Sequence, residues 1–227
     1  MSSPLSSVIR FLSLLCIGCL VAATPAHAER TLLVLGDSIS AAYGIEAEQG
    51  WVHLLARRLE ELETDVTVVN ASVSGETTGG GVVRLPGSIE RHAPDVVVIE
   101  LGGNDGLRGY PIARIRDNLA RMVSMAREAG ADVLLVGMFV PPNYGERYMN
   151  GFHQNFHTVA ADAGVPLVPF LLEGVATVPG LMQEDGIHPT ADAQGRLLDN
   201  VWPTLAPMLE LAGDATTPLA DAASTLE

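Results

Sequence analysis

The stretch TLLVLGDSIS, residues 31–40, joins an apolar run to a small polar loop and thereby decides the predicted fold. Residues 31–35 are almost entirely apolar, as expected of a strand that a sheet buries on both faces. The loop that follows contains Gly36 and a serine, Ser38. The pattern therefore predicts a parallel strand whose carboxyl end carries polar side chains.

Similar apolar runs recur along the chain, each bounded by Gly, Pro, Asn or Asp. They comprise residues 66–71, 95–101, 133–138 and 165–170. Amphipathic stretches at residues 51–63 and 112–129 have helical spacing. A last helix is expected from Thr190, its N-cap, to residue 211, with Pro203 kinking or splitting it. Strands that alternate with helices predict an α/β fold, a parallel sheet wrapped by helices in one domain.

The N-terminal residues have the pattern of an export signal. Arg10 supplies a positive charge, residues 11–22 are apolar, and Ala26-His27-Ala28 forms a small-x-small cleavage site. We therefore expect a signal peptide at residues 1–28, cleaved after Ala28, and a periplasmic or secreted protein. A lipid anchor on Cys19 and an uncleaved N-terminal anchor stay open as alternatives.

The rest of the chain is expected to form one domain at residues 29–212, followed by a disordered tail at residues 213–227. Cys16 and Cys19 both lie in the leader, so the mature chain has no disulfide and no thiol nucleophile. After the leader, no apolar run approaches the roughly 20 residues of a membrane-spanning helix.

The net charge of the chain bears on which classes of macromolecule it can bind. The 227 residues include 13 Arg and no Lys against 27 acidic residues, which gives a net charge of −14. A surface with this charge repels a phosphate backbone, so nucleic acid is not an expected partner. The sequence indicates no oligomeric state.

Small polar loops follow the predicted strands, and the carboxyl ends of parallel strands meet at one edge of a sheet. Ser38 lies in the first loop, Gly75 in the second, Asn104 in the third, and Asp185 and His188 in a loop after the last strand. Together they offer the nucleophile, base, orienting acid and oxyanion donors of acyl transfer. The sequence therefore predicts an active site at this edge.

Each of these residues also has a structural interpretation. Ser38 would serve equally well as a helix N-cap where a helix N-terminus begins. Gly75 and Asn104 are common turn residues. Asp185, three residues before His188, is placed to accept its Nδ1 proton and leave Nε2 free as a base, although an isolated D-x-x-H can be structural. The chain has no G-x-S-x-G, which argues against an α/β-hydrolase elbow.

Two other histidines, His153 and His157, have the i, i+4 spacing of metal ligands on a helix. No H-E-x-x-H pattern accompanies them, so we expect no metal site.

Four blocks together resemble the GDSL or SGNH hydrolase family: GDSIS, the Gly of SVSGETT, GGND and DGIHP. The wider match, roughly residues 31–211, is similar to its exported bacterial acyl-CoA thioesterase, lysophospholipase and arylesterase group. The resemblance implies Ser38 as nucleophile, His188 as base and Asp185 as its orienting acid. It also implies an oxyanion hole made by the Ser38 N–H, the Gly75 N–H and the Asn104 amide. The implied fold is a flavodoxin-like three-layer sandwich with strand order 2-1-3-4-5, and no cofactor is implied.

The sequence thus predicts a serine hydrolase that forms an acyl-Ser38 intermediate. Its substrates would be small-molecule acyl esters or thioesters, with lysophospholipid a further candidate. Leu107 and the apolar start of residues 139–145, which includes Val140, are expected to wall an acyl groove, unless they only pack their loops. A sugar O-acetylesterase and a non-catalytic flavodoxin-like binding module are the alternative functions.

Overall fold

The computed structural model describes residues 29–211, and within them five parallel strands form one sheet in the order β2-β1-β3-β4-β5. The strands are β1 (Arg30–Gly36), β2 (Val66–Asn70), β3 (Val96–Glu100), β4 (Asp132–Val136) and β5 (Leu167–Val168). In the centre, β1 pairs with β3 from Leu32–Val96 to Gly36–Glu100. This register brings the carboxyl end of β3 beside the loop that contains Ser38.

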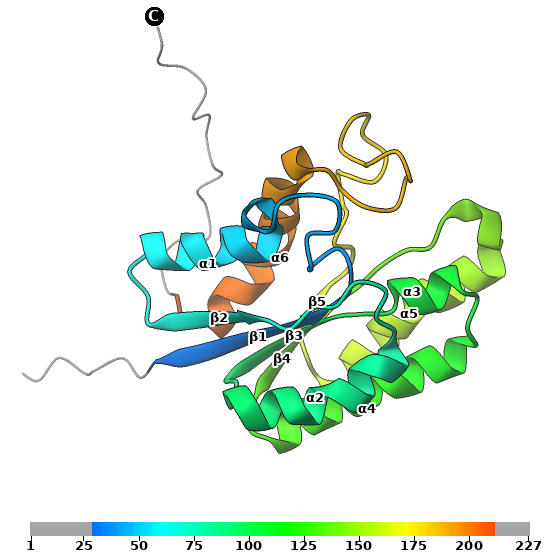
Figure 1. Cartoon of the computed structure of the whole chain (residues 1–227). Helices are drawn as coiled ribbons and strands as arrows, with labels where there is room; N and C mark the ends of the chain where they lie inside the picture. Colours follow the sequence, from blue (N-terminus) through cyan, green and yellow to red (C-terminus); the bar gives the residue numbers. More distant parts are fainter. Residues whose placement is uncertain (1–28, 212–227) are drawn as a thin grey trace, which may run out of the picture.

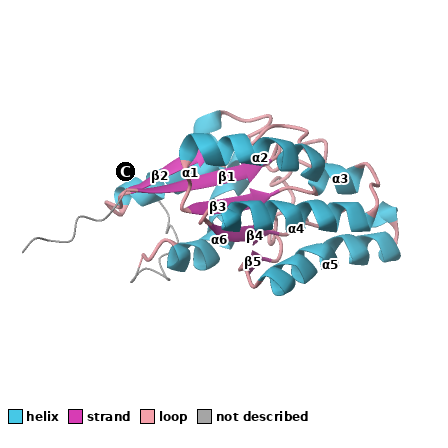
Figure 2. Ribbon diagram, turned by 90° about the horizontal axis from the view of Figure 1, so that it is seen from below, coloured by secondary structure: helices cyan, strands magenta, loops and turns pink. Residues whose placement is uncertain are grey.

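Helices cover both faces of the sheet (Figures 1 and 2). One face carries α1 (Trp51–Glu61) and α6 (Gln194–Met208), and the other carries α2 (Thr78–His92), α4 (Ile112–Glu128) and α5 (Glu146–Ala163). A short helix, α3 (Gly103–Leu107), and three 3-10 turns at Ala47–Gln49, Pro142–Tyr144 and Ala191–Ala193 complete the described elements. The fold is the expected three-layer sandwich. None of the helices within residues 29–211 is both long and apolar enough to cross a bilayer.

The core lies on both sides of the two central strands. Every residue of Val96–Glu100 in β3 is buried, as are the last five residues of β1. Helices α1 and α4 contribute large apolar side chains to this core, among them Trp51, Leu55 and Ile115. Because such interiors are close-packed, the loops at the carboxyl ends of β1 and β3 have a rigid support.

Three details of the last helix and the last strand differ from expectation. Thr190 occupies the expected N-cap position, before the 3-10 turn that leads into α6, but its side chain donates to Gly180 O at 3.1 Å and makes no capping hydrogen bond. Helix α6 begins at Gln194 and continues through Pro203 as one element, so of the two expected effects of this proline, a kink or a split, the split is wrong. The buried residues Val201 and Leu205, on either side of the proline, hold both halves of α6 against the core.

Strand β5 has only two residues, because its ladder with β4 is limited to Leu135–Leu167 and Val136–Val168. The run expected at residues 165–170 is therefore mostly loop. The expected leader at residues 1–28 and tail at residues 213–227 lie outside the described residues.

Candidate active site

Side chains from two of the loops at the carboxyl edge of the sheet form a relay of hydrogen bonds. The Nε2 atom of His188 lies 2.8 Å from the Oγ atom of Ser38. On the other side of the ring, Nδ1 lies 2.6 Å from Oδ2 of Asp185. Ser38 and His188 are 150 residues apart in sequence. The fold thus brings together the nucleophile, base and acid that the sequence predicts.

A tight turn presents the Ser38 hydroxyl at the end of β1. The side chain of Asp37 accepts from the Ile39 amide at 3.1 Å, and the Tyr43 amide donates to Ser38 O at 3.0 Å. The next helical element begins only at Ala47. Ser38 therefore caps no helix, and the expectation of a helix N-terminus at this position is wrong.

A hairpin-like loop at residues 181–190, called here the histidine hairpin, holds the acid and the base. Met182 and Pro189 form an antiparallel bridge, and Gly186, at φ +66°, makes the turn at its tip. The carboxylate of Asp185 accepts from the amides of Ile187 at 2.9 Å and His188 at 3.0 Å. The relative orientation of Asp185 and His188 is therefore fixed inside one short loop.

The hydrogen bonds within the histidine hairpin set the charge of its carboxylate. Partial burial acts to raise the pKa of Asp185, but the hydrogen bonds from the His188 ring and from the two amides outweigh it and lower the pKa to about 2. Asp185 is therefore ionised at neutral pH. An ionised carboxylate can hold the Nδ1 proton of His188 and stabilise the imidazolium that forms when Nε2 takes a proton.

Candidate oxyanion donors come from two further loops. Gly75 has φ +79°, a left-handed conformation that favours glycine. Within residues 29–211, the amides of Ser38 and Gly75 donate to no protein acceptor, so both are available to a ligand. Asn104, in α3, directs one N–H of its amide to Asp37 Oδ2 at 3.1 Å. The other N–H of this amide has no acceptor in the described part of the chain.

Two buried carboxyl groups lie beneath the nucleophile, and the sequence analysis missed both. Glu100 is fully buried at the end of β3, where its Oε2 accepts from Ser40 Oγ at 2.5 Å and from the Asp37 amide at 3.3 Å. The Trp51 indole donates to the same Ser40 hydroxyl at 3.1 Å. An acidic residue that ends an otherwise apolar strand was the signal that could have revealed Glu100.

Burial dominates the electrostatics of this pair. It raises the pKa of Asp37 to about 6, against the hydrogen bonds from Ile39 and Asn104 and the attraction of His188. Burial, with repulsion from Asp37, raises the pKa of Glu100 well above its usual range. These groups resist ionisation, in contrast to Asp185.

The two residues expected to wall an acyl groove differ in exposure. Leu107 is half-buried at the end of α3, whereas Val140 is 4 % exposed and packs against Gly106 and Phe152. The Tyr144 hydroxyl donates to Leu107 O at 2.6 Å, which ties the loops after β3 and β4 together. Leu107 is therefore partly accessible, whereas Val140 belongs to the core.

His153 and His157 lie on one face of α5, with their Nε2 atoms 3.1 Å apart. The Nδ1 atom of His153 lies 3.4 Å from Met138 O, so its hydrogen can point there while its Nε2 accepts from His157. Burial lowers the pKa of His153. Among the described residues, no group of three or more His, Cys, Asp or Glu side chains is placed to hold a metal ion.

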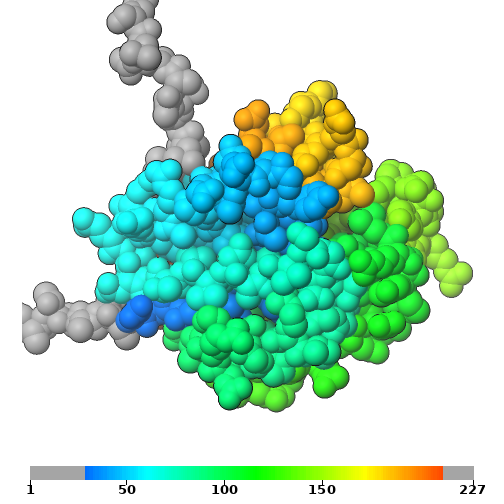
Figure 3. Space-filling view, viewed as in Figure 1, coloured from blue at the N-terminus to red at the C-terminus, as the bar shows by residue number. Residues whose placement is uncertain are grey.

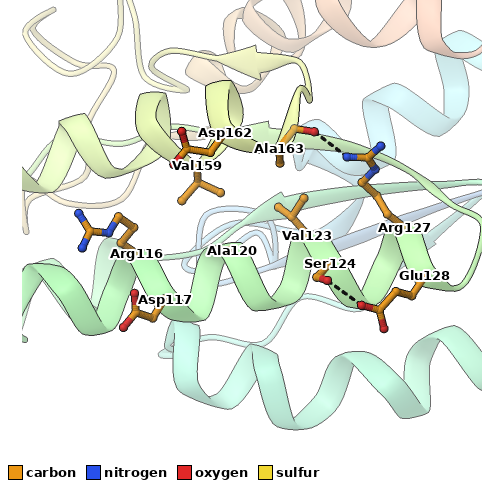
Figure 4. A pocket seen from close by; sticks show the side chains of 10 residues that line it. All are labelled: Arg116, Asp117, Ala120, Val123, Ser124, Arg127, Glu128, Val159, Asp162 and Ala163. Carbon is orange, nitrogen blue, oxygen red and sulfur yellow. Dashed lines mark hydrogen bonds between the residues drawn. The ribbon is translucent and has the colours of Figure 1, made fainter.

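A separate pocket of about 680 Å³ lies between α4 and α5, away from the strand ends (Figure 4). Arg127 donates to Ala163 O at 2.6 Å and Ser124 donates to Glu128 at 2.7 Å. Its lining carries charges of both signs and includes no histidine. This pocket therefore offers no histidine base to Ser124.

Comparisons with known proteins show which family the chain resembles. The family model for GDSL-like lipases and acylhydrolases matches residues 34–196. Esterase TesA of Pseudomonas aeruginosa is 55% identical over 199 residues, which cover 87% of this chain and 99% of that protein. Thioesterase 1/protease 1/lysophospholipase L1 of Escherichia coli is 41% identical, over 81% of this chain and 87% of that protein.

A solved structure shows the same fold. The psychrotrophic esterase EstA from Pseudoalteromonas sp., inhibited by monoethylphosphonate, superposes with a TM-score of 0.76 at 39% identity, over 80% of this chain and 99% of that one.

Proposed function

The chain belongs to the GDSL-like lipase/acylhydrolase family, and from this premise we propose how its residues divide the work of ester hydrolysis. It is a serine hydrolase that cleaves carboxylic esters. The observation that carries the assignment is the relay from Ser38 to His188 at 2.8 Å and from His188 to Asp185 at 2.6 Å.

Acylation begins when Ser38 Oγ attacks the carbonyl carbon of the ester and His188 Nε2 takes its proton. The ionised Asp185 stabilises the imidazolium that results. The Ser38 and Gly75 amides and the Asn104 side chain donate to the oxyanion of the tetrahedral intermediate, where each donor lowers the barrier by about 3 to 4 kcal/mol. The imidazolium then protonates the leaving oxygen or sulfur, and the acyl group stays on Ser38.

Deacylation repeats the same steps with water. His188 removes a proton from a water molecule, which attacks the acyl-Ser38 carbonyl, and the imidazolium returns the proton to Ser38. The products are a carboxylic acid and the alcohol or thiol released earlier. The proposed steps use only water and groups of this chain.

The direct test is the variant Ser38→Ala. We expect the fold to remain and nearly all esterase activity to disappear, together with covalent labelling by a fluorophosphonate. Ser124→Ala, on the remote helix α4, is the matched control and should behave like the wild type. Turnover by Ser38→Ala at the wild-type rate would overturn the mechanism, and an unlabelled wild type would point to a binding module.

For substrates we propose medium-chain acyl esters, with thioesters and lysophospholipids as further candidates. The half-buried side chain of Leu107 would contact the acyl chain, with Val140 buried behind the loop that follows β4, and each CH2 that becomes buried adds about 0.8 kcal/mol. We expect kcat/KM to rise from acetyl to hexanoyl esters, and Leu107→Asn to reduce hexanoyl turnover more than acetyl turnover. Val83→Asn, at an exposed apolar position of α2, is the control. A profile that peaks at acetyl would instead favour a sugar O-acetylesterase.

We also propose that the protein is exported, as residues 1–28 indicate. Processing after Ala28 leaves a mature chain that starts at Glu29. The intact mass of the exported protein tests this proposal, and a mass that retains residues 1–28, or lipid on Cys19, would contradict it.

A further inference from the structure

The two halves of the proposed triad belong to different loops, and their separation depends on what holds those loops together. Ser38 lies in the turn after β1, while Asp185 and His188 lie in the histidine hairpin. The space-filling view shows the loop after β1 (blue) against the segment that contains the hairpin (yellow to orange) at the top of the molecule (Figure 3). A side chain that binds both loops would control the distance between Ser38 and His188.

Gln183 makes such a connection. Its side-chain amide donates to Tyr43 O at 2.8 Å in the loop after β1 and to Pro189 O at 3.0 Å in the hairpin. Its main-chain amide donates to His188 O at 2.7 Å. One residue thus binds the chain on both sides of the gap that the proton must cross.

The two carbonyls that accept from the Gln183 side chain belong to Tyr43 and Pro189, and each of these residues contacts or adjoins a member of the proposed triad. The Tyr43 amide donates to Ser38 O at 3.0 Å, and the Tyr43 ring lies 4.5 Å from the His188 ring, centre to centre. Pro189 directly follows His188. A shift of the Gln183 amide is therefore transmitted to Ser38 and to His188 through one residue each.

The loop after β1 leaves room for this amide. Gly44 has φ +78°, and a Cβ atom there would overlap the side-chain oxygen of Gln183. Gly44 thus serves close approach as well as backbone conformation. Tyr43, Gly44 and Gln183, with Glu184 and Asp185, line an open pocket of about 730 Å³ behind the triad.

We propose that Gln183 is a positioning residue that fixes the imidazole of His188 against the Ser38 hydroxyl by holding the two loops together. This proposal rests on the serine mechanism above. Asp185 and His188 are oriented by hydrogen bonds inside the hairpin, so Gln183 acts on the placement of that pair as a unit. Small errors in such a placement reduce the rate of reaction while leaving substrate affinity unchanged.

The test compares Gln183→Met, which keeps the length of the side chain and removes both donors, with Gln154→Met on the exposed face of α5. We expect Gln183→Met to lower kcat and the rate of inactivation by a fluorophosphonate by about 10- to 100-fold. KM and the thermal midpoint should stay close to wild type, and Gln154→Met should change neither rate. Rates are expressed per active site titrated with the same probe, so that unfolded protein does not count.

A second variant, Gln183→Glu, has the original shape and serves if Gln183→Met does not fold. Its carboxylate cannot donate to the two carbonyls, but its protonated form can donate to one. The neighbouring carboxylates Glu184 and Asp185 favour protonation of a glutamate at this position. The ratio of Gln183→Glu to wild-type activity should therefore rise as pH falls, and groups that both proteins share affect this ratio little.

Wild-type kcat per active site in Gln183→Met, or a loss that appears only in KM, would overturn the proposal. So would a ratio of Gln183→Glu to wild-type activity that does not change with pH. Ser38→Ala is measured in parallel. If Ser38→Ala is inactive and the Gln183 variants are normal, only the positioning role fails. If Ser38→Ala remains active, the serine mechanism itself fails.

Discussion

Two aspartates, Asp37 and Asp185, lie on either side of the proposed nucleophile and base, and they have opposite electrostatics. Asp37 is 2 % exposed, and burial raises its pKa to about 6. The side chain of Asp185 is 39 % exposed, and hydrogen bonds from His188 and two amides lower its pKa to about 2 against the opposing effect of burial. The same side chain is thus easy to protonate in one loop and hard to protonate in the other.

This difference in pKa indicates which of the two carboxylates can stabilise the protonated form of the proposed base, His188. Asp185 keeps its charge because the histidine hairpin supplies N–H donors while solvent still reaches it. Asp37 receives hydrogen bonds from Ile39 and Asn104, but it is buried away from solvent beside Glu100, which is also buried. We therefore assign the electrostatic role to Asp185 and a structural one, holding the turn and the Asn104 amide, to Asp37.

The largest effect that tests this assignment is expected from Asp185→Asn. The amide no longer stabilises the imidazolium, and its NH2 group can favour the wrong tautomer of His188. We expect kcat to fall by about 10³- to 10⁴-fold in an ester assay. Glu184→Gln, the adjacent exposed acid, is the control and should remain active. A loss smaller than about tenfold would remove Asp185 from the mechanism.

A smaller effect is expected from Asn104→Ala, which removes the donor that Asp37 orients. We expect kcat to fall by about 100-fold with KM nearly constant, because the amide acts on the transition state. Asn104→Asp should lose more, since its carboxylate would face both Asp37 and the developing oxyanion. A change confined to KM would show instead that Asn104 binds the ground state.

The sequence predicts β1, β3 and β4 well because apolar runs report burial, which is the property that defines a central parallel strand. It did not predict α2, whose Gly79-Gly80-Gly81 run and Pro86 are unfavourable in a helix. Tertiary packing explains one of these residues. A Cβ at Gly81 would overlap Leu101 and Met122, so glycine permits α2 to lie close to the sheet.

Within the site, the sequence predicts those residues that combine a reactive side chain with a short recognisable motif. The D-x-x-H spacing placed Asp185 and His188 in one loop, and the structure brings both to Ser38. The contacts of Glu100 with Ser40, and of Gln183 with Tyr43, were not predictable, because these pairs are 60 and 140 residues apart. Only the strand register and the loop packing create them.

The smallest effect concerns stability and compares the two aspartates directly. The pKa of Asp37 is raised from 3.8 to about 6 in the folded protein, so between these values the folded state binds more protons than the unfolded state. Stability from this group therefore increases as pH falls from 6 towards 4. The pKa of Asp185 is lowered from 3.8 to about 2, so its contribution is present above pH 3.8 and is lost as pH falls towards 2.

Guanidinium unfolding of the wild type and of Asp37→Asn between pH 4 and pH 8 isolates the contribution of Asp37, because the contribution of Asp185 changes below this range. We expect the unfolding free energy of the wild type to rise by about 1 to 2 kcal/mol relative to Asp37→Asn as pH falls from 6 to 4, since a two-unit shift limits the effect to about 3 kcal/mol. Glu100, His188 and Asp105 also interact with Asp37. Because they are present in both proteins, most of their own titration cancels in the difference. A difference that is constant with pH, or that reverses its sign, would mean that Asp37 is ionised in the folded protein like Asp185, and the contrast between the two loops would then be wrong.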